Sequence, residues 1–143
     1  GWETRVGGLG EALGEADVAL ACSGTVTLEC AFYGVPAVVM YRASWPTYVV
    51  ARRLVQVKYL AMPNLLAGER VYPEFIQGAV TAENVAREAL DLLMNVERRA
   101  WIQGKLTGVI ESLGTPGASQ RAAEVLRRFM EQRNPELRSG LWD

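Results

Sequence analysis

The sequence contains no histidine among its 143 residues, and this absence removes several kinds of chemistry. A histidine general base, a histidine-activated nucleophile and a histidine metal site are all excluded within this chain. Only two cysteines occur, Cys22 and Cys30. They would lack further zinc ligands at suitable spacing, so we predict neither a metal site nor a cofactor. We interpret both cysteines as reduced, small apolar residues rather than as parts of a disulfide framework.

Long apolar runs and a strong charge imbalance are also missing. No run of about 18 or more apolar residues occurs, and the N-terminus shows no signal-peptide pattern, so no membrane-spanning helix is predicted. The 15 basic and 16 acidic residues leave a net charge of −1, which argues against nucleic-acid binding. Half of the residues are hydrophobic and 22% are charged, a balance typical of a folded core. The length suits one domain.

The apolar segments predict an α/β fold with a parallel sheet. A helix is expected at 9–16, a buried strand at 17–22, a helix at 25–33 that ends at Gly34, and a second buried strand at 35–41. A strand, a tight turn, a helix and a strand in this order form a βαβ unit, in which the two strands lie parallel.

The remaining segments predict further helices around a thin sheet. We expect a helix at 45–56, a short strand at 58–61, a loop with a helical turn at 65–77, an amphipathic helix after Thr81, and helices at 96–113 and 118–131. Two or three apolar strands need neighbours, so we expect the chain to begin partway through its domain. The domain is predicted to cover residues 1–133, followed by a polar tail at 134–143.

A Ser-Gly-Thr element stands between the first predicted strand and the next helix. Ligands bind at the carboxyl ends of parallel strands, close to the N–H groups of helix N-termini. Gly24 would let a phosphate approach the backbone, while Ser23 and Thr25 offer hydroxyl groups. The same three residues also suit an ordinary helix N-cap.

Other polar residues follow the same predicted edge. Glu29 stands among apolar residues and could accept hydrogen bonds from two ribose hydroxyls, although a solvent-facing glutamate fits equally well. Arg42 ends the second strand, where it could pair with a diphosphate or with a carboxylate. Asn64 is expected in a turn, where its amide could simply cap the chain. Gln77 could equally be a surface amide.

These residues together resemble a known family. The element from Ser23 to Glu29 resembles the Ser-Gly-Thr-Ala-x-Leu-Glu element of lipid-A-disaccharide synthases, and residues 35–42 resemble the strand that follows it. Residues 51–68 and 73–77 are similar to the most distinctive stretch of the family. The order and spacing of these pieces carry the resemblance, whereas the helices after Thr81 would match many proteins.

The resemblance implies the C-terminal, Rossmann-like half of a GT-B glycosyltransferase. The family transfers 2,3-diacylglucosamine from UDP to 2,3-diacylglucosamine 1-phosphate in lipid A biosynthesis, releasing UDP and inverting the anomeric centre without a metal ion. No catalytic residue is assigned to this chain, since the family keeps its candidate base in the other domain. The resemblance implies that the diphosphate contacts Ser23, Gly24 and Thr25 and that the ribose contacts Glu29. It also implies that the donor pocket is lined by Arg42, Asn64, Glu74 and Gln77.

The resemblance also implies partners and a location. We expect a UDP-sugar lipid donor, a lipid acceptor bound through the other domain, a homodimer formed through the C-terminal segments, and a cytoplasmic protein in peripheral contact with the inner membrane. This chain alone would bind UDP and catalyse nothing.

Trp45-Pro46 departs from the family, which often has a small residue before this proline. The alternatives are another UDP-sugar GT-B transferase, acting on a lipid-linked peptidoglycan precursor, and a non-catalytic nucleotide-binding or interaction module.

Overall fold

The computed structural model describes residues 3–46, 48, 57–115 and 117–133. The chain divides into two compact units, Gly1–Ser112 and Leu113–Asp143. Most of the helix expected at 45–56, and all of the polar tail, lie outside the described residues.

The first unit is built on a parallel sheet of three strands. The strands are β1 (Ala19–Cys22), β2 (Ala37–Tyr41) and β3 (Glu74–Ile76), and β2 lies between the other two. In the register, Ala19 lies opposite Ala37, and Tyr41 lies opposite Ile76. The α/β fold and the parallel pairing of the βαβ unit are therefore confirmed. All three strands end at the same edge of the sheet, which we call the carboxyl edge.

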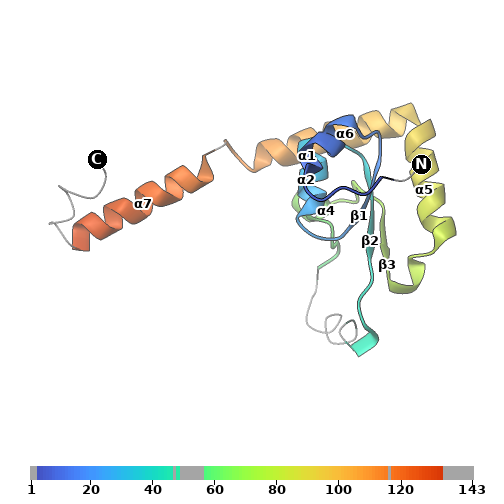
Figure 1. Ribbon diagram of the computed structural model, residues 1–143, viewed down its shortest axis with the longest axis horizontal. Coiled ribbons are helices and arrows are strands. Elements are labelled where there is room, and N and C mark those ends of the chain that lie inside the picture. The colour runs from blue at the N-terminus through green and yellow to red at the C-terminus, as the bar shows by residue number, and fades with distance from the viewer. Residues whose placement is uncertain (1–2, 47, 49–56, 116, 134–143) are drawn as a thin grey trace. The chain divides into compact units, whose positions relative to one another are not determined.

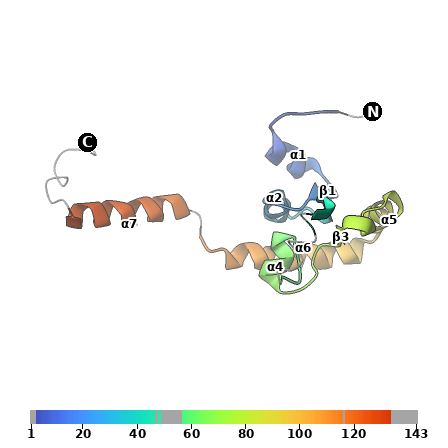
Figure 2. The ribbon, with the colours of Figure 1, turned by 90° about the horizontal axis from the view of Figure 1, so that it is seen from below.

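Helices cover both sides of this sheet. In the first unit they are α1 (Leu9–Glu15), α2 (Val26–Phe32), α4 (Met62–Ala67), the 3-10 helix η1 (Gln77–Ala79), α5 (Ala82–Met94) and α6 (Val96–Ser112). Helices α2 and α4 lie on one side of the sheet and α5 lies on the other (Figures 1 and 2). Helix α6 packs against α2, α4 and α5. It runs past the amino ends of the strands, where the Gln103 amide donates a hydrogen bond to the Gly34 carbonyl at 3.2 Å.

Local sequence signals explain where several helices begin and end. The Thr81 hydroxyl accepts a hydrogen bond from the Asn84 N–H at 3.2 Å, as an N-cap residue does, so α5 starts where the sequence predicts. Gly34 follows α2 with φ 67° and Gly68 follows α4 with φ 68°. Glycine adopts this left-handed conformation without a Cβ penalty, which is why both helices stop there.

The core of the first unit centres on β2. Val38 and Val39 are buried on opposite faces of this strand, and both helical layers pack against it. Tyr72 is also fully buried, and its hydroxyl donates to the Val35 carbonyl at 2.8 Å. Burial raises the pKa of the Tyr72 hydroxyl well above its usual range, because the phenolate would lose its hydration.

The third strand is not where the sequence predicts it. Residues 58–61 form no strand, and the segment that pairs with β2 is Glu74–Ile76, which was expected as a loop. The N–H groups of Leu60 and Ala61 donate to the Glu74 carboxylate, so they are not available to a sheet. Pro63 lies in the first turn of α4, where its missing N–H costs nothing.

Strand β1 is less buried than expected. The prediction of a strand covered on both faces is wrong, since the Leu20 side chain is 56% exposed and Cys22 is exposed as well. β1 forms one edge of the described sheet, and only Ala21 is fully buried. Both cysteines are free, and only Cys30 is a buried, apolar-like residue.

The second unit contains one described helix, α7 (Ala118–Arg133). It carries an apolar stripe of Val125, Leu126 and Phe129, and these side chains are solvent-exposed. On its polar side, the guanidinium groups of Arg127 and Arg128 bind the Glu124 carboxylate at 2.9 Å. These hydrogen bonds lower the pKa of the Glu124 carboxyl to about 2, and the bond from Arg127 contributes most. Within the described ranges, no helix combines the length and apolarity needed to cross a bilayer.

We expect burial on α5 to decide the cost of removing a leucine side chain. Leu92 is fully buried and Leu90 on the same helix is 59% exposed. Leu92→Ala should therefore lower the free energy of unfolding by about 2–5 kcal/mol, because it removes buried methyl groups and leaves a cavity. Leu90→Ala should cost less than about 1 kcal/mol. Urea denaturation measures both, and equal costs would contradict the arrangement of this helix.

Candidate functional site

The carboxyl edge brings together residues that are distant in the sequence. Ser23 directly follows β1, Arg42 directly follows β2, and Gln77 directly follows β3. The Ser23 N–H extends the sheet by donating to the Met40 carbonyl at 2.9 Å. Loops at this edge of a parallel sheet are where open α/β proteins bind their ligands.

The turn formed by Ser23, Gly24 and Thr25 is open to solvent. Gly24 has φ 153°, and no atom lies within 4 Å of the position that a Cβ would take. A ligand can therefore approach its backbone closely. Thr25 occupies the N-cap position of α2, but no side chain accepts a capping hydrogen bond there. The sequence also allowed an ordinary N-cap at these residues, but no hydroxyl group of the turn caps α2 in the structure.

Glu29 and Arg42 both face solvent at this edge. The Glu29 side chain is exposed, which is compatible with both interpretations, a ribose acceptor and a solvent-facing glutamate. Among the residues that the structure describes, neither side chain has a hydrogen-bond or ion-pair partner. A carboxylate and a guanidinium group are therefore left free to bind a ligand with hydroxyl and phosphate groups.

Asn64 is placed differently, because its side chain is fully buried in α4. Its Oδ1 accepts from the N–H groups of Val71 at 2.9 Å and Tyr72 at 2.7 Å. Its Nδ2 donates to the Tyr72 carbonyl at 2.8 Å and to Glu74 at 2.7 Å. An amide side chain has two donor and two acceptor positions, so this asparagine is fully used within the chain.

Glu74 also binds groups of the chain itself. Its Oε2 accepts from the Leu60 N–H at 3.0 Å, and its Oε1 accepts from the Ala61 N–H at 2.8 Å and from Asn64. The carboxylate therefore fixes the segment that leads from residue 57 into α4. It is partly buried beside this segment.

Gln77 fixes the loop that follows β2. Its side-chain oxygen accepts from the Ala43 N–H at 2.7 Å, and its side-chain nitrogen donates to the Ala43 carbonyl at 3.1 Å. Gln77 itself has φ 52°, a left-handed conformation that non-glycine residues seldom adopt. The two hydrogen bonds between Gln77 and Ala43 fix the backbone next to Arg42, which directly precedes Ala43, at the carboxyl edge.

One further residue, Thr27, shapes the turn and was missed from the sequence. The Thr27 hydroxyl donates to the Gly24 carbonyl at 2.7 Å and accepts from the Met62 N–H at 3.3 Å. The Ser23 hydroxyl donates to the Leu60 carbonyl at 3.1 Å. The signal for Thr27 was a hydroxyl residue on a predicted helix face that is otherwise apolar, since a buried hydroxyl needs a partner.

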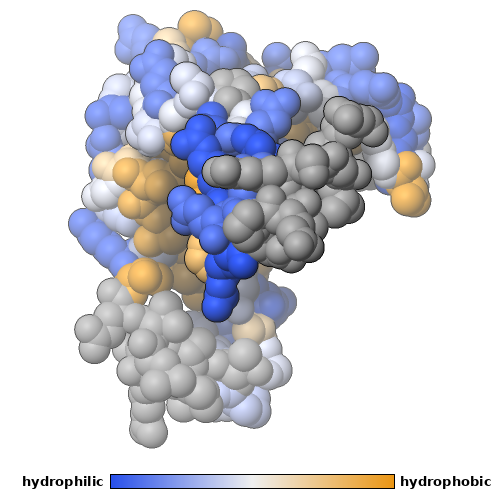
Figure 3. Space-filling view, turned by 90° about the vertical axis from the view of Figure 1, so that its left-hand side faces the viewer, coloured by the Kyte–Doolittle hydropathy of each residue, from blue (hydrophilic) through white to orange (hydrophobic). Residues whose placement is uncertain are grey.

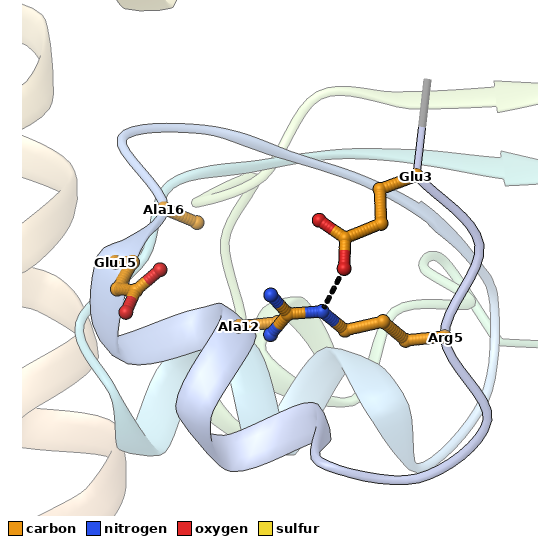
Figure 4. Close-up of a pocket in the computed structure, with 5 residues that line it drawn as sticks. All are labelled: Glu3, Arg5, Ala12, Glu15 and Ala16. Carbon is orange, nitrogen blue, oxygen red and sulfur yellow. Dashed lines mark hydrogen bonds and ion pairs between the residues drawn. The ribbon is translucent and has the colours of Figure 1, made fainter. Parts of the chain in front are cut away.

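A separate hollow lies beside α1 and away from this edge. It has a volume of about 330 Å³ and is lined by Glu3, Arg5, Ala12, Glu15 and Ala16 (Figure 4). Glu3 and Arg5 are paired with each other at 2.7 Å. None of the eight candidate residues lines it, and Ala16 precedes the amino end of β1, so this hollow is not part of the candidate site.

The fold and the edge together define a class of protein, a Rossmann-like α/β domain with its ligand loops at the carboxyl ends of parallel strands. The family profile described as "Lipid-A-disaccharide synthetase" matches residues 7–129. The chain belongs to the lipid-A-disaccharide synthase family. Members of this family have the GT-B fold, and the resemblance seen in the sequence is confirmed.

Relatives in several bacteria match most of the chain. The lipid-A-disaccharide synthase of Syntrophus aciditrophicus is 42% identical over 113 residues, which are 79% of this chain and 30% of that protein. That of Nitrosococcus oceani is 40% identical over 124 residues, 87% of this chain and 32% of that protein. That of Synechocystis is 38% identical over 120 residues, 82% of this chain and 30% of that protein. The chain thus spans about a third of the length of these relatives.

We expect the turn to require glycine at position 24 for its backbone conformation. Gly24→Ala should lower the free energy of unfolding by about 1–3 kcal/mol, because its φ of 153° strains an L-residue even though space is open. Gly14→Ala is the matched control, since Gly14 lies inside α1 with equally open space. This second change should stabilise the protein by about 0.5–1 kcal/mol. Thermal and urea denaturation measure whether each change raises or lowers the free energy of unfolding. An unchanged stability of Gly24→Ala would show that the backbone at position 24 is not strained by a side chain.

Proposed function

We propose that this chain supplies the donor-nucleotide site of a glycosyltransferase of lipid A biosynthesis. The observation that carries the proposal is the group of solvent-facing polar residues at the carboxyl edge, in a chain of this family. Thr25, Glu29 and Arg42 have side chains without partners among the described residues, and Gly24 leaves its backbone open. The hydroxyl and guanidinium groups can donate hydrogen bonds to the diphosphate of UDP, and the carboxylate can accept them from its ribose.

Each outward-facing residue has a distinct role in this proposal. The diphosphate binds at Ser23, Gly24 and Thr25, where the N–H groups of Gly24 and Thr25 and the Thr25 hydroxyl donate to phosphate oxygens. Ser23 holds the turn in place, because its N–H and its hydroxyl already donate to the carbonyls of Met40 and Leu60. The Glu29 carboxylate accepts from the ribose hydroxyls. Arg42 donates to the diphosphate and lowers the energy of the negative charge that develops on departing UDP.

The three remaining predicted residues support this pocket from within. Asn64, Glu74 and Gln77 line the donor pocket, as the family implies. Their hydrogen bonds to the chain itself support a role in holding the pocket's loops. They act on the donor mainly through the backbone that they hold.

The reaction proposed for the whole protein is the transfer of 2,3-diacylglucosamine from UDP to 2,3-diacylglucosamine 1-phosphate. A hydroxyl oxygen of the acceptor forms a bond to the anomeric carbon, the bond from that carbon to the diphosphate oxygen breaks, and UDP leaves. The base that takes the hydroxyl proton is proposed outside this chain. This chain alone is therefore expected to bind UDP without catalysing transfer.

The proposed partners are the lipid-bearing donor, the lipid acceptor and a second copy of the chain. The exposed apolar stripe of α7 supports a homodimer formed through the C-terminal segments. Other large apolar side chains are exposed on the first unit, among them Phe32, Leu65 and Leu66, and Figure 3 shows apolar surface on the protein. Such surface suits peripheral contact with a membrane, and we propose a cytoplasmic protein that contacts the inner membrane in this way.

We expect Glu29→Ala to weaken UDP binding without unfolding the protein. The ribose would lose its acceptor, so the dissociation constant should rise about tenfold or more, as expected for a hydrogen bond to a charged group. Isothermal titration calorimetry with UDP measures this change. Glu15→Ala is the control, because Glu15 is equally exposed but lies on α1, ahead of the amino end of β1. Equal affinities of the two variants would refute the ribose assignment.

We expect magnesium to leave UDP binding unchanged. In the proposed site the diphosphate charge is met by Arg42 and by backbone N–H groups, so no divalent cation is needed to bridge the phosphates. Titration of UDP with and without excess MgCl2 tests this directly. A strong gain in affinity with magnesium would instead point to a metal-dependent class of transferase.

A further inference from the structure

We propose that Glu74 is a positioning residue that holds the Ser23–Thr25 turn in the geometry needed to bind a nucleoside diphosphate. This inference rests on the proposed function and deepens it. It gives Glu74 a role that acts through the backbone of residues 60–62 rather than through contact with the ligand.

A continuous path of hydrogen bonds joins Glu74 to the turn. Its carboxylate accepts from the N–H groups of Leu60 and Ala61. The Leu60 carbonyl in turn accepts from the Ser23 hydroxyl at 3.1 Å. Ser23 is the first residue of the turn, so the carboxylate is connected to it through a single residue, Leu60.

A second path reaches the other end of the turn. Met62 follows the two residues that Glu74 holds, and its N–H donates to the Thr27 hydroxyl at 3.3 Å. This hydroxyl donates to the Gly24 carbonyl at 2.7 Å. The orientation of the Gly24 peptide, which carries φ 153°, is therefore fixed from the side of residues 60–62. The Thr27 N–H also donates to this carbonyl, at 3.1 Å, so Thr27 holds the Gly24 carbonyl through both its backbone and its side chain.

The three donors around position 74 require a side chain in which both terminal atoms accept hydrogen bonds. Three donors converge on this carboxylate, two from the backbone and one from the buried amide of Asn64. A carboxylate only accepts, and it satisfies all three. Glutamine would keep one accepting oxygen and turn an NH2 group toward the Leu60 or Ala61 N–H. Two donors would then face each other, and the segment 60–62 would shift.

The same bonds argue against Glu74 as a direct ligand of the nucleotide. The distances to its three donors are 3.0, 2.8 and 2.7 Å, so both oxygens are already engaged. One accepting position remains, on Oε2, and any further bond to a ligand would have to displace a backbone N–H that has no other acceptor among the described residues. A buried N–H left without a partner is costly, which favours the positioning role.

The test compares Glu74→Gln with Tyr72→Phe in the purified protein. Tyr72→Phe also removes a hydrogen bond, from the buried Tyr72 hydroxyl to the Val35 carbonyl, but it does so at the amino end of β2. It therefore controls for general destabilisation. UDP affinity is measured by calorimetry at a temperature where urea denaturation shows both variants to be folded. Hydrogen exchange, followed by mass spectrometry without ligand, reports on the amides of Thr27 and Met62, which Glu74 does not touch.

The proposal expects two linked changes in Glu74→Gln. Exchange at Thr27 and Met62 should become faster than in Tyr72→Phe, and the UDP dissociation constant should rise about tenfold more than in that control. Weaker UDP binding with unchanged exchange at Thr27 and Met62 would overturn the positioning role in favour of direct contact. Affinity equal to that of Tyr72→Phe would overturn it while leaving the proposed function intact. Failure of the unaltered protein to bind UDP would overturn both.

Discussion

The parallel pairing of β2 with a strand on each side brings together the candidate residues that follow the strands, Ser23, Arg42 and Gln77. Because all three strands run in the same direction, the residues that follow them meet at one edge, although Ser23 and Gln77 are far apart in the sequence. The pairing depends in turn on burial of β2, whose Val38 and Val39 fill the core on both faces. The site is therefore a consequence of how this one strand is packed.

At that edge the polar residues divide into two groups by the direction in which they point. Gly24, Thr25, Glu29 and Arg42 face solvent, while Ser23, Asn64, Glu74 and Gln77 bind groups of the chain itself. A buried side chain with all its hydrogen bonds satisfied is rigid, and rigid support costs no reorganisation when a ligand binds.

The sequence predicts the first βαβ unit well, because its signals are local. The apolar runs of 17–22 and 35–41 and the terminating Gly34 each act over a few residues. The third strand was misplaced, since Glu74–Ile76 is a strand only through its pairing with β2, and a segment this short carries little propensity of its own. The resemblance named Asn64 and Glu74 as site residues, but their burial and mutual bond depend on a tertiary arrangement that no local pattern encodes.

The hydrogen bond between Ser23 and Leu60 joins residues that are 37 positions apart, and Glu74 lies 14 positions further along. Closing loops of this size costs chain entropy before the contacts compensate for it. During synthesis the Ser-Gly-Thr turn leaves the ribosome well before the residues that hold it in place, since chains emerge from the N-terminus. The proposed nucleotide pocket is therefore complete only after β3 has joined the sheet, and newly made chains pass through a stage that has the motif without the proposed site.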